Sequence, residues 1–434
     1  MIPARRSIWL VLALFVLAIA LGFFPDYGQE WQIVAYVFIG VVLADGLSVF
    51  GKRHIKVERT VMHALSLGAW ANVELTLHNH YGYPVKLEIF DHVPQELEYE
   101  GLPVEITIPS RNWLKVNYRV KPIVRGPVEF KKIQIRMFSV LGLWKRNIIQ
   151  RLVSEVRNYP NFSSVMKYSL LATDQRLNQM GILKKRRRGE GLDFHQLREY
   201  RDGDSLRQVD WKATARTNKL ISRDYQEERD QQIIFLVDCG RRMLAHDDQL
   251  SHFDHTLNAI LLLSHVALRQ GDAVGLMTFS GDERWIPPRK SIGNVNSILN
   301  SIYDLQPSLL SPDYSRAAME LMKRQKRRAL IVLITNLRDE DTDELIPALQ
   351  IMRKRHLVLL ASMQESAINK LLDQDVHGFE LALNHASAQH YLGYRRDAHQ
   401  RINGAGVLYT DVMPQDLPIT IVNRYLDVKS SGQL

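Results

Sequence analysis

The chain contains one cysteine, Cys239, among its 434 residues. A single thiol cannot form an intramolecular disulfide, which excludes a disulfide-stapled secreted scaffold and suits a reducing compartment. The composition of a disordered or low-complexity protein is also missing, because 46% of the residues are hydrophobic and 24% are charged. A folded chain of this length has room for two or three domains.

Motifs of catalysis are missing as well. The sequence contains no nucleophile–base pair, no glycine-rich loop that would cradle a phosphate and no matched pair of carboxylates. Each of these arrangements depends on fixed residue types at fixed spacings. Their absence favours a binding protein over an enzyme, and a hydrolase of unrecognised type is the remote alternative.

Two long apolar runs are present at the start of the chain. Residues 8–24 carry no charge, and residues 31–50 carry only Asp45. Each run is about long enough to cross the hydrocarbon core of a bilayer as a helix. Basic residues flank both outer ends, so we predict that 1–54 is a transmembrane helical hairpin, with the bulk of the chain in the cytoplasm. A cleaved signal peptide is the alternative, but the second run argues against it.

Residues 55–157 show the two-residue alternation of β-strands. Apolar and polar side chains alternate over 73–77, 85–89, 104–108 and 130–137. Turn signals separate these runs, so we predict six or seven short antiparallel strands that form a small β-sandwich domain. No cluster of side chains in this domain suggests chemistry, which favours a role as a spacer or a docking module.

Residues 158–229 form a charged connector. Within it, residues 181–229 contain 13 Lys and Arg and 9 Asp and Glu, a large part of the chain's net charge of +9. The acidic residues would repel phosphates, which disfavours nucleic acid as a partner. A solvated linker is an alternative, but linkers are normally rich in Gly, Ser or Pro rather than in residues such as Phe194 and Val209. We therefore expect a folded element that presents a charged surface to a protein.

Candidate interaction residues are concentrated in 189–217 of this connector. We expect a short helix from Ser205, with Asp204 as its N-cap. Such a helix would place Arg207 and Trp211 on one face. The residues expected to contact a protein partner here are Arg198, Tyr200, Arg201, Asp204, Arg207, Asp210, Trp211 and Arg216.

Strand-like and helix-like patterns alternate in the last domain, 230–434. This alternation predicts an α/β domain with a mainly parallel, doubly wound sheet. Ser251 and Asp254 have the spacing of a capping box at the start of the first helix. The predicted strands are 233–238, 273–279, 285–286, 329–336, 356–363 and 406–412, and the predicted helices are 253–269, 294–304 and 313–327.

An aspartate, Asp238, closes the first predicted strand. Ligands bind at the carboxyl ends of strands in open α/β sheets, and a lone carboxylate there suggests a metal ligand. The residues that follow, however, include Arg241 and Arg242 rather than oxygen donors. The pattern therefore leaves open a metal site, the remnant of one, or a binding surface.

The series of strands and helices, with an aspartate at the end of its first strand, resembles a von Willebrand factor A domain of Rossmann type. Residues 189–217, GEGLDFHQLREYRDGDSLRQVDWKATART, resemble the hallmark of a bacterial family catalogued as domain of unknown function 58. Residues 125–127 and 140–144 are similar to upstream landmarks of that family. The resemblance covers the chain from about residue 55 to its end and implies a β-sandwich followed by a von Willebrand A-like domain.

The resemblance implies a divalent cation held by an Asp-x-Ser-x-Ser loop, a threonine and a second aspartate, since such ions prefer oxygen ligands. Of these positions only Asp238 is kept. The serines are replaced by Gly240 and Arg242, the threonine region is 311–313, and the second aspartate is Asn336. We expect a degenerate site in which Asp238 is satisfied by Arg241 or Arg242 and by helix N–H groups, with Arg242 as the group that would pair with it in place of the metal. Asp238 is the candidate ligand for Mg or Mn, and no other cofactor is expected.

The resemblance also implies a partner, because proteins of this family are commonly associated with MoxR-type AAA+ ATPases. We therefore expect a membrane-tethered adaptor or scaffold at the bacterial inner membrane, acting with such an ATPase in envelope or stress-related assembly. Asp238 and Arg242 would shape the upper edge of the sheet beside the partner. A metal-dependent ligand-binding module that uses a degenerate metal-ion-dependent adhesion site is the alternative.

Overall fold

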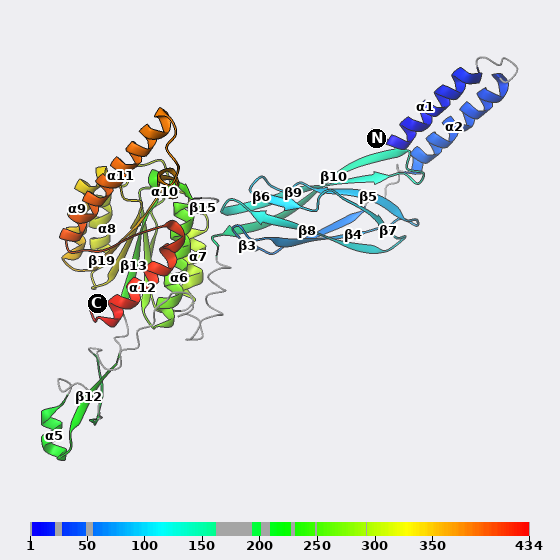
Figure 1. Cartoon of the computed structure of the whole chain (residues 1–434). Coiled ribbons are helices and arrows are strands. Elements are labelled where there is room, and N and C mark those ends of the chain that lie inside the picture. Colours follow the sequence, from blue (N-terminus) through cyan, green and yellow to red (C-terminus); the bar gives the residue numbers. More distant parts are fainter. Residues whose placement is uncertain are drawn as a thin grey trace. The chain divides into compact units, whose positions relative to one another are not determined.

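The computed structural model describes residues 2–21, 28–48, 55–161, 193–200, 209–226, 231–247, 250–291 and 293–433. They belong to two compact units, Met1–Tyr159 and Pro160–Leu434 (Figure 1). The fold is mixed α/β with several sheets, as predicted.

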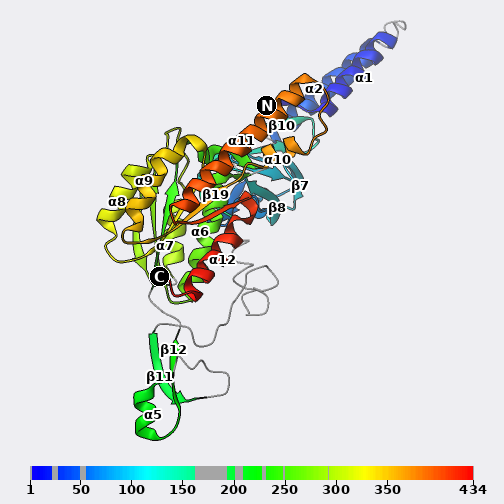
Figure 2. The same cartoon turned by 60° about the vertical axis from the view of Figure 1, so that its left-hand side comes forward.

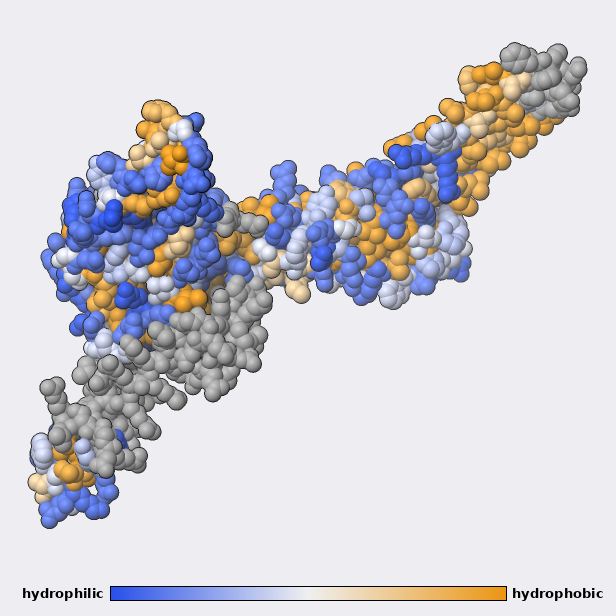
Figure 3. Space-filling model, in the orientation of Figure 1, coloured by the Kyte–Doolittle hydropathy of each residue, from blue (hydrophilic) through white to orange (hydrophobic). Residues whose placement is uncertain are grey.

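Two helices lie where the sequence predicts membrane spans. The short strand β1, Ile2–Pro3, is followed by α1, Arg5–Leu21, and α2, Gly28–Ser48. Figure 3 shows apolar surface over most of the visible face of these helices. Across the described ranges, no helix combines the length and the apolarity that a membrane crossing requires. The two-span arrangement stays a prediction.

Two β-sheets share one apolar core in the rest of the first unit. One sheet has the order β1-β10-β9-β5-β7, with β3 paired to β10, and the other has the order β2-β4-β8-β6. Alternate residues of both sheets, such as Leu75 and Leu87, point into the common core. The strands are β2 Lys56–Thr60, β3 Ala64–Ser66, β4 Ala71–His78, β5 Val85–Asp91, β6 Leu97–Glu100, β7 Val104–Ile108, β8 Trp113–Pro122, β9 Gly126–Phe138 and β10 Trp144–Tyr159.

The second unit begins with a small element that we call the motif element, comprising residues 193–200 and 209–226. Strands β11, Asp193–Glu199, and β12, Ile221–Gln226, pair antiparallel. Helix α5, Trp211–Thr217, lies between them in the sequence.

A six-stranded sheet forms the centre of the second unit. Its order is β17-β16-β13-β18-β19-β20, and all neighbours are parallel except β17, which runs antiparallel to β16. The chain starts in the middle of the sheet and winds outward in both directions, as a doubly wound sheet does. The strands are β13 Gln232–Asp238, β16 Ala273–Phe279, β17 Trp285–Arg289, β18 Leu330–Thr335, β19 Leu357–Met363 and β20 Leu408–Val412.

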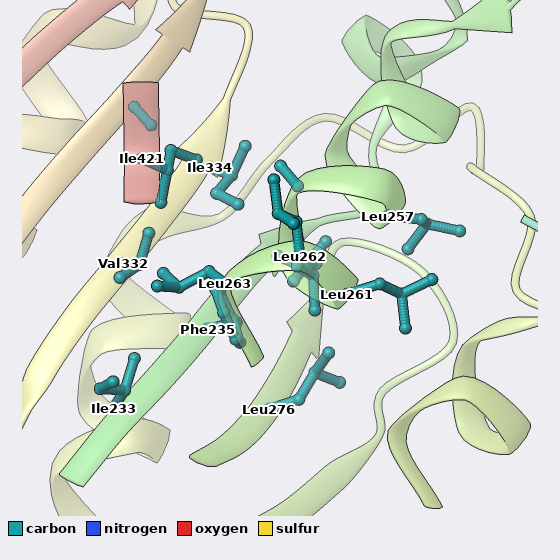
Figure 4. Close-up of a cluster of buried hydrophobic side chains, with 14 of the residues drawn as sticks. Ile233, Phe235, Leu257, Leu261, Leu262, Leu263, Leu276, Val332, Ile334 and Ile421 are labelled. Atoms are coloured by element: carbon teal, nitrogen blue, oxygen red, sulfur yellow. The ribbon is translucent and has the colours of Figure 1, made fainter. Parts of the chain in front are cut away.

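Helices cover both faces of this sheet (Figures 1 and 2). Because side chains alternate along a strand, Phe235 packs under α6 and α12 while Leu236 packs under α8 and α9. Figure 4 shows the first of these two cores, in which Phe235 lies among leucines of α6. The helices are α6 His252–Arg269, α7 Asn294–Ile302, α8 Tyr314–Arg324, α9 Thr342–Arg353, α10 Ser366–Leu372, α11 Phe379–Gly404 and α12 Leu417–Ser430.

Short elements complete the second unit near the carboxyl ends of its strands. Two of them matter for the site: the 3-10 helix η3 follows β13, and the 3-10 helix η4 follows β18. The short elements are η3 Arg241–Leu244, β14 His246–Asp247, β15 Leu250–Ser251, η4 Asp339–Asp341 and η5 Pro414–Asp416.

Candidate functional site

Asp238 lies at the carboxyl end of β13 and is fully buried. Its Oδ1 accepts a hydrogen bond from the backbone N–H of Gly240 at 2.8 Å, and its Oδ2 accepts one from Thr335 Oγ1 at 2.8 Å. Tyr314 Oη lies 3.1 Å from Thr335 Oγ1. Because the threonine proton is given to Asp238, the tyrosine donates to the threonine. The carboxylate is thus held by a buried chain of hydroxyl groups from β18 and α8.

Burial raises the pKa of Asp238 to about 6. The two hydrogen bonds from Gly240 and Thr335 favour the ionised form and oppose this rise, as does the guanidinium of Arg242. The nearby carboxylate of Asp341 adds to the rise. The carboxyl group therefore titrates closer to neutral pH than an exposed aspartate.

Arg242 is buried, but it does not pair with Asp238, so that prediction is wrong. Its Nη2 donates to Glu340 Oε1 and to Asp341 Oδ1, each at 2.8 Å. The physical reason is the position of the two 3-10 helices, since η3 follows β13 and η4 follows the neighbouring strand β18. Arg242 lowers the pKa of Glu340, whereas burial raises the pKa of Asp341 in spite of this pair.

Gly240 stands at the first of the two serine positions that the resemblance implies. A Cβ at this position would lie 2.8 Å from the backbone oxygen of Leu310 and 3.0 Å from Asp238 Oδ1. The segment 308–310 lies directly against it, since Ser308 N–H donates to the carbonyl of Cys239 and Arg241 N–H donates to that of Leu310. The structure therefore leaves no room for a ligand side chain at Gly240.

The remaining implied ligand positions do not converge on Asp238. Asn336 is buried, and its Nδ2 lies 3.3 Å from His252 Nδ1 and 3.2 Å from Glu365 Oε1. Asp313 caps α8 by accepting from the N–H of Arg316. Among the residues that the structure describes, no three His, Cys, Asp or Glu side chains gather as a cation site requires. With a guanidinium beside Asp238, this donor set does not fit a divalent cation.

A pocket of about 620 Å³ lies near the carboxyl ends of β19 and β20, against α10 and α11. Its floor contains the buried Arg395, which pairs with Asp411 at 2.6 Å. Arg395 also donates to the carbonyls of Leu337 and Met363 and to Ser362 Oγ. Because its donors are used within the protein, Arg395 ties α11 to three strand ends rather than offering charge to a ligand. The sequence carried no periodic signal for this residue.

The motif element holds five of the predicted contact residues. Asp210 is the N-cap of α5, and its side chain accepts from the N–H groups of Lys212 and Ala213. The predicted start of a helix at Ser205 lies outside the described residues; in the described part, Val209 pairs with Ser222 and α5 begins only after Asp210. The predicted contact residues Arg201, Asp204 and Arg207 lie outside the described residues.

The described side chains of the motif element differ in exposure. Trp211 is 67% exposed and Arg216 is also exposed, whereas Arg198 and Tyr200 are half-buried. Tyr200 N–H donates to the carbonyl of Leu220, which continues the pairing of β11 with β12. These backbone bonds and the capped helix belong to a folded element rather than to an open linker.

Several residues around Asp238 and Arg242 were not predicted from the sequence. Thr335 and Tyr314 complete the hydroxyl chain at Asp238, and Glu340 and Asp341 take the charge of Arg242. Of these residues, only the acidic run 339–341 was visible as a signal in the sequence, because it directly follows a predicted buried strand. That strand, β18, is the neighbour of β13, which ends at Asp238.

Residues 196–385 match the family model described as protein of unknown function DUF58. A relative, the uncharacterized protein YeaD of Bacillus subtilis strain 168, is 22% identical over 349 residues, covering 77% of this chain and 83% of that protein. The match begins within the motif element and includes the sheet edge around Asp238. Both findings support the family resemblance that the motif indicated.

Solved structures show weaker likenesses. An aerotolerance-related membrane protein of Bacteroides fragilis NCTC 9343, with multiple mutations to serine, is 17% identical with a TM-score of 0.29, covering 45% of this chain and 98% of that chain. Proximal thread matrix protein 1 of the mussel byssus is 10% identical with a TM-score of 0.27, covering 46% of each chain. At these TM-scores neither likeness establishes fold or function.

Proposed function

We propose that this chain is a membrane-attached adaptor that acts by binding a protein, with a MoxR-type AAA+ ATPase as that partner. The observation that carries the proposal is the exposure of Trp211 on a capped, hydrogen-bonded element. Tryptophan and arginine are the residues that contribute most to binding energy at protein interfaces. The exposed indole of Trp211 on a folded element is therefore proposed to contact a protein partner.

Other exposed apolar residues of the motif element support a protein contact. Leu197 and Leu220 are both about half exposed. The same element exposes Arg216, and Arg223 pairs with Asp210 at its surface. Apolar anchors bordered by charged side chains are the usual composition of a protein interface.

The α/β domain is proposed to be of the von Willebrand A type. Its strand order, with one antiparallel edge strand, supports that assignment. At the carboxyl edge of the sheet, Arg242 pairs with Asp341 and Gly240 leaves no room for a ligand side chain. We therefore expect the partner to bind without a metal ion.

Membrane attachment is supported by the surfaces of α1 and α2. Residues on both helices, such as Trp9, Phe15 and Val37, leave more than half of their surface exposed. Burial of apolar surface is favourable by roughly 25 cal/mol per Å², so helices of this kind are driven out of water. A bilayer would bury the apolar surfaces of α1 and α2, with the remaining chain at the cytoplasmic face of the bacterial inner membrane.

The test is co-purification of the full chain from bacterial membranes after crosslinking, followed by identification of the recovered proteins. The variant Trp211→Ala should lose most of the AAA+ ATPase recovered with the unmodified chain, because truncation of such an anchor costs about 2 kcal/mol or more of binding free energy. Trp113→Ala is the matched control, since Trp113 is an exposed tryptophan on β8.

Thermal melting should be the same for both variants, because both indoles are exposed. The proposal fails if no AAA+ ATPase is recovered even after crosslinking. Equal losses in Trp211→Ala and Trp113→Ala would remove the motif element as the contact.

A further inference from the structure

The turn between β9 and β10, residues 139–143, is fastened to the end of α2. We call it the junction turn. Asp45 Oδ2 accepts from Ser139 Oγ at 2.5 Å and from Leu143 N–H at 3.2 Å, while its Oδ1 accepts from Leu141 N–H at 2.9 Å. Hydrogen bonds to a carboxylate are stronger than those between neutral groups. The one charge in the second apolar run thus holds this turn in place.

A second set of bonds fastens the junction turn to α1. Strand β1 pairs antiparallel with β10, with Ile2 opposite Lys145. The N–H of Ala4, directly before α1, donates to the carbonyl of Leu143 at 2.8 Å. On the α2 side, Trp144 Nε1 donates to the carbonyl of Val42 at 2.9 Å. The junction turn therefore lies where α1 begins and α2 ends, and Figure 1 shows β10 reaching this end of the helices.

The tip of the junction turn is apolar and exposed. Val140 is 64% exposed and Leu141 is 53% exposed. Because the turn is fastened to both helices, these side chains lie at the end of the apolar helices α1 and α2. A turn in water normally presents polar residues, so this tip needs an apolar environment on one side.

Basic residues lie next to the same turn. Arg5 and Arg6 open α1 and are exposed, and a Cβ added at Gly142 would lie 3.5 Å from Arg6 Nη1. Lys145 and Arg146 follow the turn on β10 and are half-buried. Two apolar side chains within a group of four cations match the boundary of a bilayer, where apolar tails meet anionic headgroups.

We propose that the junction turn lies in the headgroup region of an anionic membrane, with Val140 and Leu141 among the lipid chains and the four basic residues at the lipid phosphates. The inference rests on the proposed membrane attachment through α1 and α2. A protein would also cover apolar side chains, but the cations and the continuity with the apolar helices favour lipid.

The experiment uses the full chain reconstituted in vesicles of phosphatidylcholine, with and without phosphatidylglycerol. An environment-sensitive fluorophore is attached to Val140→Cys and, as a matched control, to Val153→Cys. Val153 is also an exposed valine, on β10, nine residues beyond Trp144 and roughly 30 Å along the strand. The native Cys239 is buried, so the unmodified chain measures background labelling. No other protein is present.

We expect the label at position 140 to shift its emission to the blue and to be quenched by lipids spin-labelled near the headgroup. Both effects should be several-fold stronger with phosphatidylglycerol. The label at position 153 should keep the emission of a probe in water. Replacing Arg5 and Arg6 by glutamine should remove most of the dependence on the anionic lipid.

Flotation of the vesicles separates the two ways of failing. If the chain does not float with lipid, the proposed membrane attachment is overturned and this inference with it. If the chain floats but the label at position 140 behaves like that at position 153, only the junction turn proposal is overturned. A blue shift that is equal in both kinds of vesicle would overturn the role of the basic residues.

Discussion

Asp238 and Arg242 are separated by three residues, and each is satisfied by different groups. Asp238 is held by a backbone N–H and a threonine hydroxyl, whereas Arg242 neutralises the acidic run after β18. Their charges still act on each other, because Arg242 opposes the rise in the pKa of Asp238. The aspartate of the first strand therefore keeps its position, and two hydrogen-bond donors of the protein engage its carboxylate.

The raised pKa of Asp238 predicts a pH dependence of stability. Its pKa is about 6 in the folded chain and about 3.9 when unfolded. Between these values the folded chain binds more protons than the unfolded chain, so the free energy of unfolding falls as pH rises from about 4 to about 6. The loss amounts to about 3 kcal/mol, and Asp238→Asn should abolish it.

Urea unfolding of the second unit, measured for both chains across this range, checks the prediction. The quantity of interest is the difference between the two chains. Burial lowers the pKa of His252 to about 4, so protonation of His252 destabilises both chains as pH falls and cancels in that difference. If the difference in the free energy of unfolding between the two chains stays constant with pH, the raised pKa of Asp238 is contradicted.

At the scale of elements, local signals marked most boundaries of the α/β domain. The capping box at α6 is confirmed, since Ser251 Oγ accepts from Asp254 N–H and the Asp254 carboxylate accepts from Ser251 N–H. The start of α5 was missed. Asp210 has the side chain of an N-cap, and the pairing of Val209 with Ser222 is a β-bridge directly before it. A contact with β12 thus precedes the helix that Asp210 caps.

The capping box predicts a measurable loss of stability. Ser251→Ala removes the hydroxyl that satisfies an N–H in the first turn of α6, and it should lower the free energy of unfolding by about 1 kcal/mol. The control is Ser297→Ala in the interior of α7, where the serine is exposed and alanine favours the helix. Chemical denaturation of both variants checks this, and equal stabilities would argue against the cap.

At the scale of the whole molecule, the two compact units have separate apolar cores. The first core lies between the two β-sheets and includes Leu87, and the second unit has a core on each face of its sheet. We expect two thermal transitions in calorimetry of the full chain. Leu87→Ala should move one transition to lower temperature and Phe235→Ala the other. Each substitution should lower the free energy of unfolding of its own unit by about 3 kcal/mol, since both residues are fully buried. A single transition that moves with both substitutions would contradict independent units.

The sequence by itself indicated the mixed α/β class of the fold and the positions of many of its strands along the chain. Periods of two residues marked β4, β5, β7 and β9, and apolar runs marked the buried parallel strands. These signals are local, because they come from which face of each segment is buried. Strands β3 and β6 were missed, since three or four residues are too few to show alternation, and the longer strands β8 and β10 were not among the predicted runs either.

Only the tertiary structure decided the partners of the charged groups. Arg242 pairs with Asp341, 99 residues away, and Asp45 holds Ser139, 94 residues away. Such pairs depend on which strands become neighbours and on where each turn comes to lie, and a single sequence contains no measure of that distance. The resemblance indicated an aspartate without its ion, but the folded sheet decided that the arginine beside it pairs elsewhere.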